Sequence, residues 1–183
     1  RPGTAADFRH ANPFGVFAAW GDRRAAKLLQ RAPVAGCPAI HSVSLSADFP
    51  VAELTFADPD LPFPISLLHF SPFIPHDSKH SGLPIAVSVF RLANPTQTPV
   101  TVGLLACCIN AVGSWNVGRY NRMVRQPGLL GLSCRRQPYD PIDERLGELA
   151  LMTDAPRGAR ASDADVSYLA TWMYAAHPFR GNR

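Results

Sequence analysis

A group of histidines in the middle of the chain has the residue types and spacing of a metal site. His76 and His80 stand four positions apart, with Asp77 between them and His69 upstream. Two histidines at this spacing share one face of a helix and can hold zinc there. The flanking residues are ones that interrupt helices: Pro72, Pro75, Gly82 and Pro84. We therefore expect a polar surface loop without a helix, and we assign no metal ligand.

Carboxylates near residue 140 are the second candidate, because a glycosidase needs two carboxyl groups flanking the bond that it cleaves. They are Asp140, Asp143, Glu144 and Glu148. They belong to or follow a turn-rich segment at 137–141, which favours turn-forming and solvated roles. Ser133 lies in a predicted strand without a neighbouring base, and no G-x-S-x-G motif occurs. We assign no catalytic residue and no cofactor.

Cysteine usage argues against a structural zinc site. The chain has four cysteines, with no C-x-x-C spacing among them: Cys37, Cys107, Cys108 and Cys134. Cys107 and Cys108 are adjacent in an apolar run, so we expect them to point to opposite faces of a strand. Buried free thiols fit a reducing compartment, and we expect a cytoplasmic location.

Aromatic side chains could stack on the face of a sugar ring, and Trp115, Tyr120 and Tyr139 fall in predicted loops. The candidates for substrate binding are Trp115, Tyr120 and Phe73, with Phe70 and Tyr139 as alternatives. Core packing or loop anchoring is the competing role for each of them.

Basic residues give the chain a formal net charge of +4, and only Lys27 and Lys79 are lysines. The densest group is Arg119, Arg122, Arg125, Arg135 and Arg136. Nucleic-acid binding would need these side chains to converge on one face, and no recognition helix or RNA-binding signature accompanies them. No apolar stretch reaches the roughly 18 residues of a membrane span. We therefore expect neither nucleic acid nor a transmembrane segment.

Short alternating segments are the dominant local pattern. The chain has 183 residues, and its 18 prolines and 13 glycines are spread along it, as turns between many strands require. Alternation predicts strands at 14–20, 40–45, 51–56, 65–70, 83–92, 100–109, 129–134, 148–153 and 166–173. Residues 22–30 fit either a short helix or the second strand of a hairpin.

These strands predict an all-β fold, an antiparallel β-sandwich. The loop at 94–99, Asn-Pro-Thr-Gln-Thr-Pro, predicts a hairpin that pairs 83–92 with 100–109. We expect residues 1–183 to form one sandwich domain, with residues 1–38 the least regular part.

Several of these segments resemble glycoside hydrolase family 116, the bile-acid β-glucosidases or non-lysosomal glucosylceramidases. They are FPVAELTFADPDLP at 49–62, FSPFIP at 70–75, SGLP at 81–84, LANPT at 92–96, GLLGL at 128–132, GELAL at 147–151 and VSY at 166–168. The likeness covers about residues 39–175. Its motifs are structural, a strand before an Asp-Pro turn among them, and none is catalytic.

The resemblance implies a two-domain parent in which an N-terminal β-sandwich precedes an (α/α)6 barrel. The barrel cleaves β-glucosides with retention, and in some members the substrate is the glycolipid glucosylceramide. Its two catalytic carboxylates match no position here. We therefore expect this chain to be a part of the N-terminal region, inactive by itself, that supports the barrel and shapes its pocket rim. A free-standing carbohydrate-binding sandwich is the alternative, and it would need an exposed aromatic platform.

Overall fold

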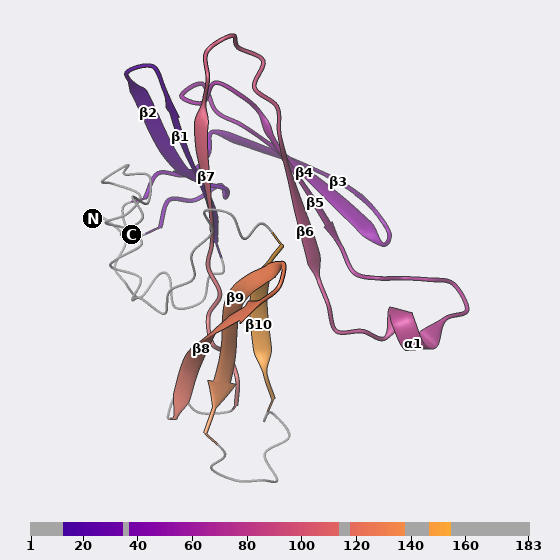
Figure 1. Cartoon of the computed structure of the whole chain (residues 1–183). Coiled ribbons are helices and arrows are strands. Elements are labelled where there is room, and N and C mark those ends of the chain that lie inside the picture. The colour runs from indigo at the N-terminus through magenta and orange to yellow at the C-terminus, as the bar shows by residue number, and fades with distance from the viewer. Residues whose placement is uncertain (1–12, 35–36, 114–117, 138–146, 155–183) are drawn as a thin grey trace. The chain divides into compact units, whose positions relative to one another are not determined.

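The computed structural model describes residues 13–34, 37–113, 118–137 and 147–154. Within these ranges the chain forms ten strands and one short helix, and every pair of neighbouring strands is antiparallel (Figure 1). The strands make three sheets in two compact units. The first unit contains Pro13–Ala106, and the second contains the described residues of Cys107–Leu169. The predicted all-β antiparallel architecture is confirmed.

A three-stranded sheet opens the first unit. Its strands are β1 (Phe14–Trp20), β2 (Arg23–Leu28) and β7 (Thr101–Ala106), in the order β2-β1-β7. The open choice at 22–30 is thus settled as the second strand of a hairpin. Gly21 turns the chain between β1 and β2 with a φ of 52°, which glycine adopts without steric cost.

A four-stranded sheet follows along the chain. Its strands are β3 (Ser42–Asp48), β4 (Val51–Ala57), β5 (Ile65–Phe70) and β6 (Val87–Leu92), in sequence order. The helix α1 (Ser78–Ser81) lies in the connection between β5 and β6. In β4 the predicted alternation holds, because Leu54 and Phe56 are shielded from solvent while Glu53 and Thr55 are exposed.

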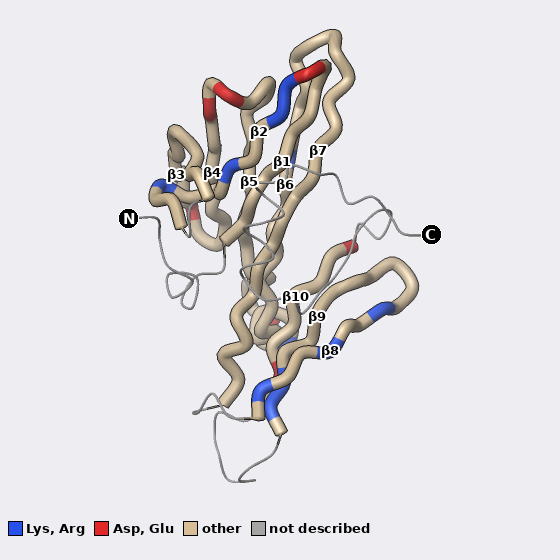
Figure 2. Tube along the Cα trace, turned by 90° about the vertical axis from the view of Figure 1, so that its left-hand side faces the viewer, with Lys and Arg blue, Asp and Glu red and all other residues tan. Residues whose placement is uncertain are grey.

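The second unit contains another three-stranded sheet, with β9 (Leu129–Arg136) between β8 (Arg119–Gln126) and β10 (Leu149–Thr153). Arginines are concentrated on β8 and β9 (Figure 2). The sequence did not predict β8, and Tyr120 lies within it, so the prediction that Tyr120 falls in a loop was wrong. No helix in the described ranges has the length and apolar character needed to cross a bilayer.

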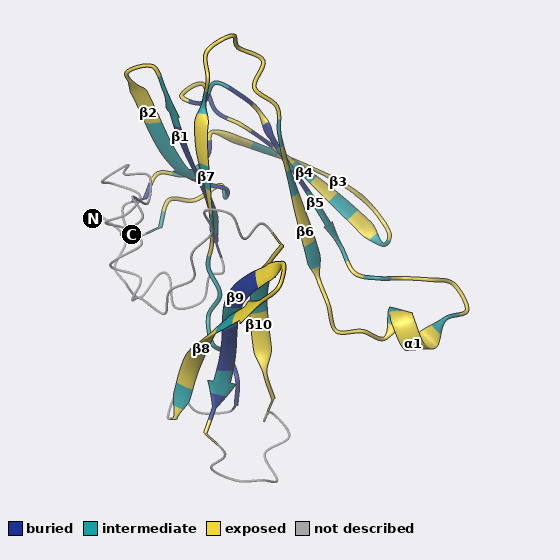
Figure 3. Cartoon of the chain, viewed as in Figure 1, coloured by how far each residue is buried: buried dark blue, intermediate teal, exposed yellow. Residues whose placement is uncertain are grey.

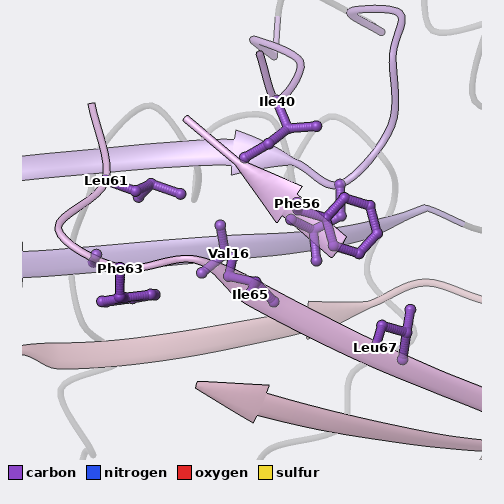
Figure 4. Close-up of a cluster of buried hydrophobic side chains, with 9 residues drawn as sticks. Val16, Ile40, Phe56, Leu61, Phe63, Ile65 and Leu67 are labelled. Carbon is purple, nitrogen blue, oxygen red and sulfur yellow. The ribbon is translucent and has the colours of Figure 1, made fainter. Parts of the chain in front are cut away.

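Buried apolar side chains join the two sheets of the first unit (Figure 4). Figure 3 colours each described residue of the chain by its burial. Val16 and Ala18 of the three-stranded sheet belong to one cluster with Phe56, Ile65 and Leu67 of the four-stranded sheet. The connecting segments add four more members: Leu29, Ile40, Leu61 and Phe63. Each large side chain buried here stabilises the fold by about 1.5–3 kcal/mol. Two sheets packed around one apolar layer make this unit a β-sandwich.

One predicted pairing was wrong. The strands β6 and β7 do not form a hairpin, because β6 pairs with β5 and β7 pairs with β1. The segment between them crosses from one sheet to the other. Asn94 organises this crossing, since its side chain accepts from the backbone N–H of Thr96 (3.0 Å) and donates to the carbonyl of Thr98 (2.8 Å). The loop is therefore satisfied by its own hydrogen bonds without a strand ladder on either side.

Two further strand predictions end differently. The strand β7 stops at Ala106, so Cys107 and Cys108 follow it and do not occupy opposite faces of a strand. The predicted strand at 166–173 lies outside the described residues.

Candidate functional site

The three predicted sugar-binding aromatics have different outcomes. Phe73 lies in the connection between β5 and α1 in the first unit, and Tyr120 lies on β8 in the second. Trp115 lies outside the described residues, as does the alternative Tyr139. Phe73 and Tyr120 therefore belong to different compact units.

Phe73 belongs to an exposed apolar group at one end of the four-stranded sheet. It is 50% exposed, and its ring meets that of Phe49, 79% exposed, edge to face at 5.0 Å. Phe49 lies in the turn between β3 and β4. Other large apolar side chains in the connection from β5 to β6 are also exposed: Ile74, Leu83 and Ile85. We refer to Phe49, Phe73, Ile74, Leu83 and Ile85 as the apolar end.

The connection that carries this group is fixed by hydrogen bonds. Ser81 Oγ donates to the carbonyl of Ile74 (3.0 Å) and accepts from its N–H (2.9 Å), which closes the segment on itself. Asp77 caps α1 by accepting from the backbone N–H of His80 (3.0 Å), and its other oxygen lies 2.6 Å from His80 Nδ1. These bonds hold the pKa of the Asp77 carboxyl below its usual value, and the bond from the backbone N–H of His80 has the largest effect.

The histidine cluster is thus part of a loop that is held by its own hydrogen bonds. One turn of helix forms where we expected none, yet His76 precedes it with a φ of 64°, so the two histidines do not share a helical face. Among the described residues, no three histidine, cysteine, aspartate or glutamate side chains are grouped to hold a metal ion.

A polar cluster lies on one face of the β8–β9–β10 sheet. Ser133 Oγ, which is fully buried, donates to Glu148 Oε1 at 2.5 Å. Arg135 donates from Nε to Ser133 Oγ (2.9 Å), and its Nη2 lies 3.0 and 2.8 Å from the two carboxylate oxygens of Glu148. Tyr120 stands opposite Arg135 in the strand register, so the two residues share this face of the sheet.

The groups around Glu148 favour its ionised form. The hydroxyl of Ser133 contributes most to lowering the pKa of Glu148, and the guanidinium of Arg135 adds to this effect. A general acid in a glycosidase needs a raised pKa so that it stays protonated until it donates. Glu148 has the opposite property, and it ties the start of β10 to β9.

The five arginines of this sheet divide between its two faces. Side chains alternate along a strand, so the face with Tyr120 also carries Arg122 and Arg135. The opposite face carries the other three: Arg119, Arg125 and Arg136. Arg119 donates from Nε to the carbonyl of Val112 (2.9 Å), and Arg136 is buried. These five arginines therefore do not converge on one face of the sheet, which nucleic-acid binding through them would require.

Sequence reasoning missed two features of these sites. Ser133 and Arg135 are two positions apart in a predicted strand, so their shared face could have been inferred. Glu148 could not be predicted as their partner, because the sequence of neither strand by itself reveals the register in which β10 pairs with β9. Phe49 was likewise assigned only to a strand-and-turn motif, since its exposure depends on what covers the turn.

The chain was also compared with known proteins. A family model described as beta-glucosidase 2, glycosyl-hydrolase family 116 N-term, matches residues 4–179. No curated protein sequence gives a significant match.

Proposed function

The chain belongs to the N-terminal domain family of glycosyl-hydrolase family 116, and from that membership we propose that it is a non-catalytic β-sandwich supporting a separate catalytic domain. That domain would cleave a β-glucoside, glucosylceramide being one candidate substrate. Catalysis needs two carboxyl groups held at a fixed separation on a rigid scaffold. A sandwich packed against the catalytic domain can brace that scaffold and shape the rim of its pocket.

The apolar end is the observation that carries this proposal. It exposes two contacting phenylalanine rings and three large aliphatic side chains. Contiguous apolar surface beyond a few hundred Å² is uncommon on true monomers, whereas interfaces between domains bury roughly 600–1,500 Å². The nearby polar groups of Asp77, His80 and Ser81 already bond within their own loop. They leave few convergent partners for sugar hydroxyls, which favours a protein partner over a sugar.

The proposal is tested by the behaviour of the chain with and without a partner. The purified chain should bind a hydrophobic dye and self-associate, and a family 116 catalytic domain added in trans should reduce both effects. Phe49→Ser and Phe73→Ser should each reduce dye binding and capture of the catalytic domain. Met123→Ser is the matched control, because Met123 on β8 is 52% exposed and lies in the other unit.

A monodisperse chain that binds no dye and ignores the catalytic domain would contradict the supporting role. It would favour the alternative, a free-standing carbohydrate-binding module. Tyr120 is the residue that favours this alternative, because it is 43% exposed and lies opposite Arg135 in the strand register. Binding of a glucoside that is lost on Tyr120→Ala, with the fold intact by circular dichroism, would establish it.

We also propose a cytoplasmic location. The four cysteines are free thiols, as expected in a reducing compartment.

A further inference from the structure

The strand β3 forms an exposed edge of the four-stranded sheet in the first unit. Among the described strands it pairs only with β4, which leaves its other edge open. Of its seven residues, only Val43 is half-buried, and the others are exposed (Figure 3). An open edge presents a row of backbone N–H and C=O groups that can pair with a further strand. The outer edge of β3 is therefore a surface on which another strand can add.

This edge lacks the residues that usually protect one. Lysine, arginine and proline discourage edge-to-edge pairing, and β3, with the sequence SVSLSAD, contains none of them. Its charged residue, Asp48, is the last of the strand. The edge strands β2, β6 and β8 each carry arginine. The other two described edge strands are less suitable, because β10 has only five residues and Gly103 interrupts β7.

One face of β3 continues the apolar face of the sheet. Val43 stands opposite Phe56, which is buried in the core, and Leu45 stands opposite Leu54, which packs against the core. Residues that face each other across two strands lie on the same side of a sheet, so Leu45 belongs to the face that carries the core. Leu45 is nevertheless 66% exposed. A strand added beside β3 would extend this face and shield Leu45.

We propose that β3 pairs with β3 of a second copy of this chain, antiparallel and about a two-fold axis that passes beside Leu45. In this register each facing pair matches in character: Leu45 with Leu45, Val43 with Ala47, Ser44 with Ser46, and Ser42 with Asp48. The two Asp48 carboxylates lie at opposite ends of the pair, so no like charges face each other. A parallel pair in register would instead place these two carboxylates side by side, which favours the antiparallel arrangement.

The pair uses a different surface from the apolar end and goes beyond the supporting role proposed above. The apolar end consists mainly of side chains in the connection from β5 to β6, whereas the contact between the two copies runs along the backbone of β3. A pair of seven-residue strands is small for a protein interface, so we expect a weak dimer with a dissociation constant in the micromolar range. The Phe73→Ser variant should keep this dimer.

The first test introduces cysteine beside the proposed axis. In Leu45→Cys the two new thiols face each other with their Cβ atoms about 5 Å apart, so mild oxidation should join two chains at this position. Ser42→Cys is the matched control on the same strand, because the two copies of residue 42 lie roughly 20 Å apart in this register. It should not join to itself, but it should join to Asp48→Cys when the two variants are mixed. Proteolysis and mass spectrometry without reduction identify the joined residues.

The second test measures the dimer by analytical ultracentrifugation over a range of concentrations, in the Phe73→Ser background so that the apolar end does not contribute. Leu45→Lys places two like charges opposite each other and should weaken the dimer by about tenfold or more. Val89→Lys is the matched control, because Val89 is a 38% exposed residue of β6, the opposite edge strand of the same sheet. It should leave the dissociation constant unchanged.

Amide hydrogen exchange tests the unmodified chain, so the outcome does not depend on a variant that fails to fold. Exchange along β3 should slow as the concentration of the chain rises through the micromolar range. Exchange along β3 that is independent of concentration would overturn the proposal, as would equal self-crosslinking of Ser42→Cys and Leu45→Cys. A dimer that Val89→Lys weakens as much as Leu45→Lys would also overturn it. Protection of β3 that requires an added family 116 catalytic domain would show that this domain, and not a second copy, pairs with the edge.

Discussion

At the scale of single residues, Asp58 is a buried carboxylate of the first unit with three bonding partners. Its carboxylate is 1% exposed, accepts from the backbone N–H groups of His41 and Asp60 (2.9 Å each), and lies 3.2 Å from Lys27 Nζ. Asp58→Ala removes the acceptor for two backbone N–H groups and an ionic partner of Lys27, whose side chain is only 14% exposed. We expect a loss of about 3 kcal/mol in the free energy of unfolding. Urea denaturation followed by circular dichroism measures it.

Asp60 provides the comparison for this prediction. It also bonds Lys27, at 2.8 Å, but its side chain is 64% exposed. Solvent screens such a pair, so Asp60→Ala should cost far less than Asp58→Ala. Equal losses in the two variants would show that the ion pair with Lys27, and not the capping of backbone N–H groups, is what stabilises this turn.

Glu148 gives a prediction about acid stability. Its usual pKa is 4.5, and the bonds from Ser133 and Arg135 lower it in the folded chain. The unfolded chain therefore binds the proton more readily than the folded chain. The stability that this adds is present above about pH 4.5 and is lost as the pH falls through the lower folded pKa.

Glu148→Gln should accordingly make unfolding less sensitive to acid while lowering stability at neutral pH. Denaturant midpoints measured between about pH 7 and about pH 3 report this as a shallower slope for the variant. Glu53→Gln is a suitable control, because Glu53 is an exposed carboxylate on β4 in the other unit. An unchanged slope for Glu148→Gln would mean that the folded and unfolded pKa values are the same.

At the scale of elements, alternation predicted strands well and their partners poorly. The apolar side of β4 was read correctly because burial of one face needs only the period of two within that strand. The pairing of β6 with β7 was wrong because an alternating strand satisfies the same pattern beside any neighbour. Sequence adjacency then favoured a hairpin that the sandwich does not use.

The strand β8 was missed for a related reason. Its sequence, RYNRMVRQ, places polar side chains on both faces and spreads its few apolar residues over both as well. Neither face shows the apolar stripe that marks a strand in sequence. Its pairing with β9 is what makes it a strand, and the polar cluster around Tyr120 could not be predicted without that register.

Gly131 tests how closely β10 packs on β9. A Cβ built there would meet the carbonyl oxygen of Leu151 and come within 2.7 Å of Met152 Sδ and 2.8 Å of its Cα. In an open strand alanine is usually better than glycine, but here β10 must move to make room. We expect Gly131→Ala to cost about 2 kcal/mol in the free energy of unfolding. It should also speed amide exchange along β10.

Gly147, two residues before the start of β10, is the matched control. Nothing lies within 4 Å of a Cβ built at that position. Gly147→Ala should leave both stability and exchange close to wild type. A Gly131→Ala variant as stable as Gly147→Ala would show that β10 does not lie tightly on β9 in solution.

At the scale of the whole molecule, the family match and the two compact units divide the chain differently. The match runs over residues 4–179 and so includes described residues of both units. A family domain therefore need not be a single contact-dense body, and the expectation of one domain over 1–183 stays a prediction. Thermal unfolding observed separately in each unit, for example by amide exchange, would show whether the two lose structure together.

Catalytic activity is also a property of the whole molecule, because the fold must place two carboxylates on either side of one bond. Glu148 is held ionised by Ser133 and Arg135, and Asp140 lies outside the described residues. We expect the purified chain to hydrolyse an aryl β-glucoside no faster than buffer, and we expect Asp140→Asn and Glu148→Gln to leave that rate unchanged. A family 116 catalytic domain assayed alongside shows that the substrate and conditions are competent. Turnover by the pure chain that either substitution abolishes would show that the supporting role is wrong and that this sandwich carries its own active site.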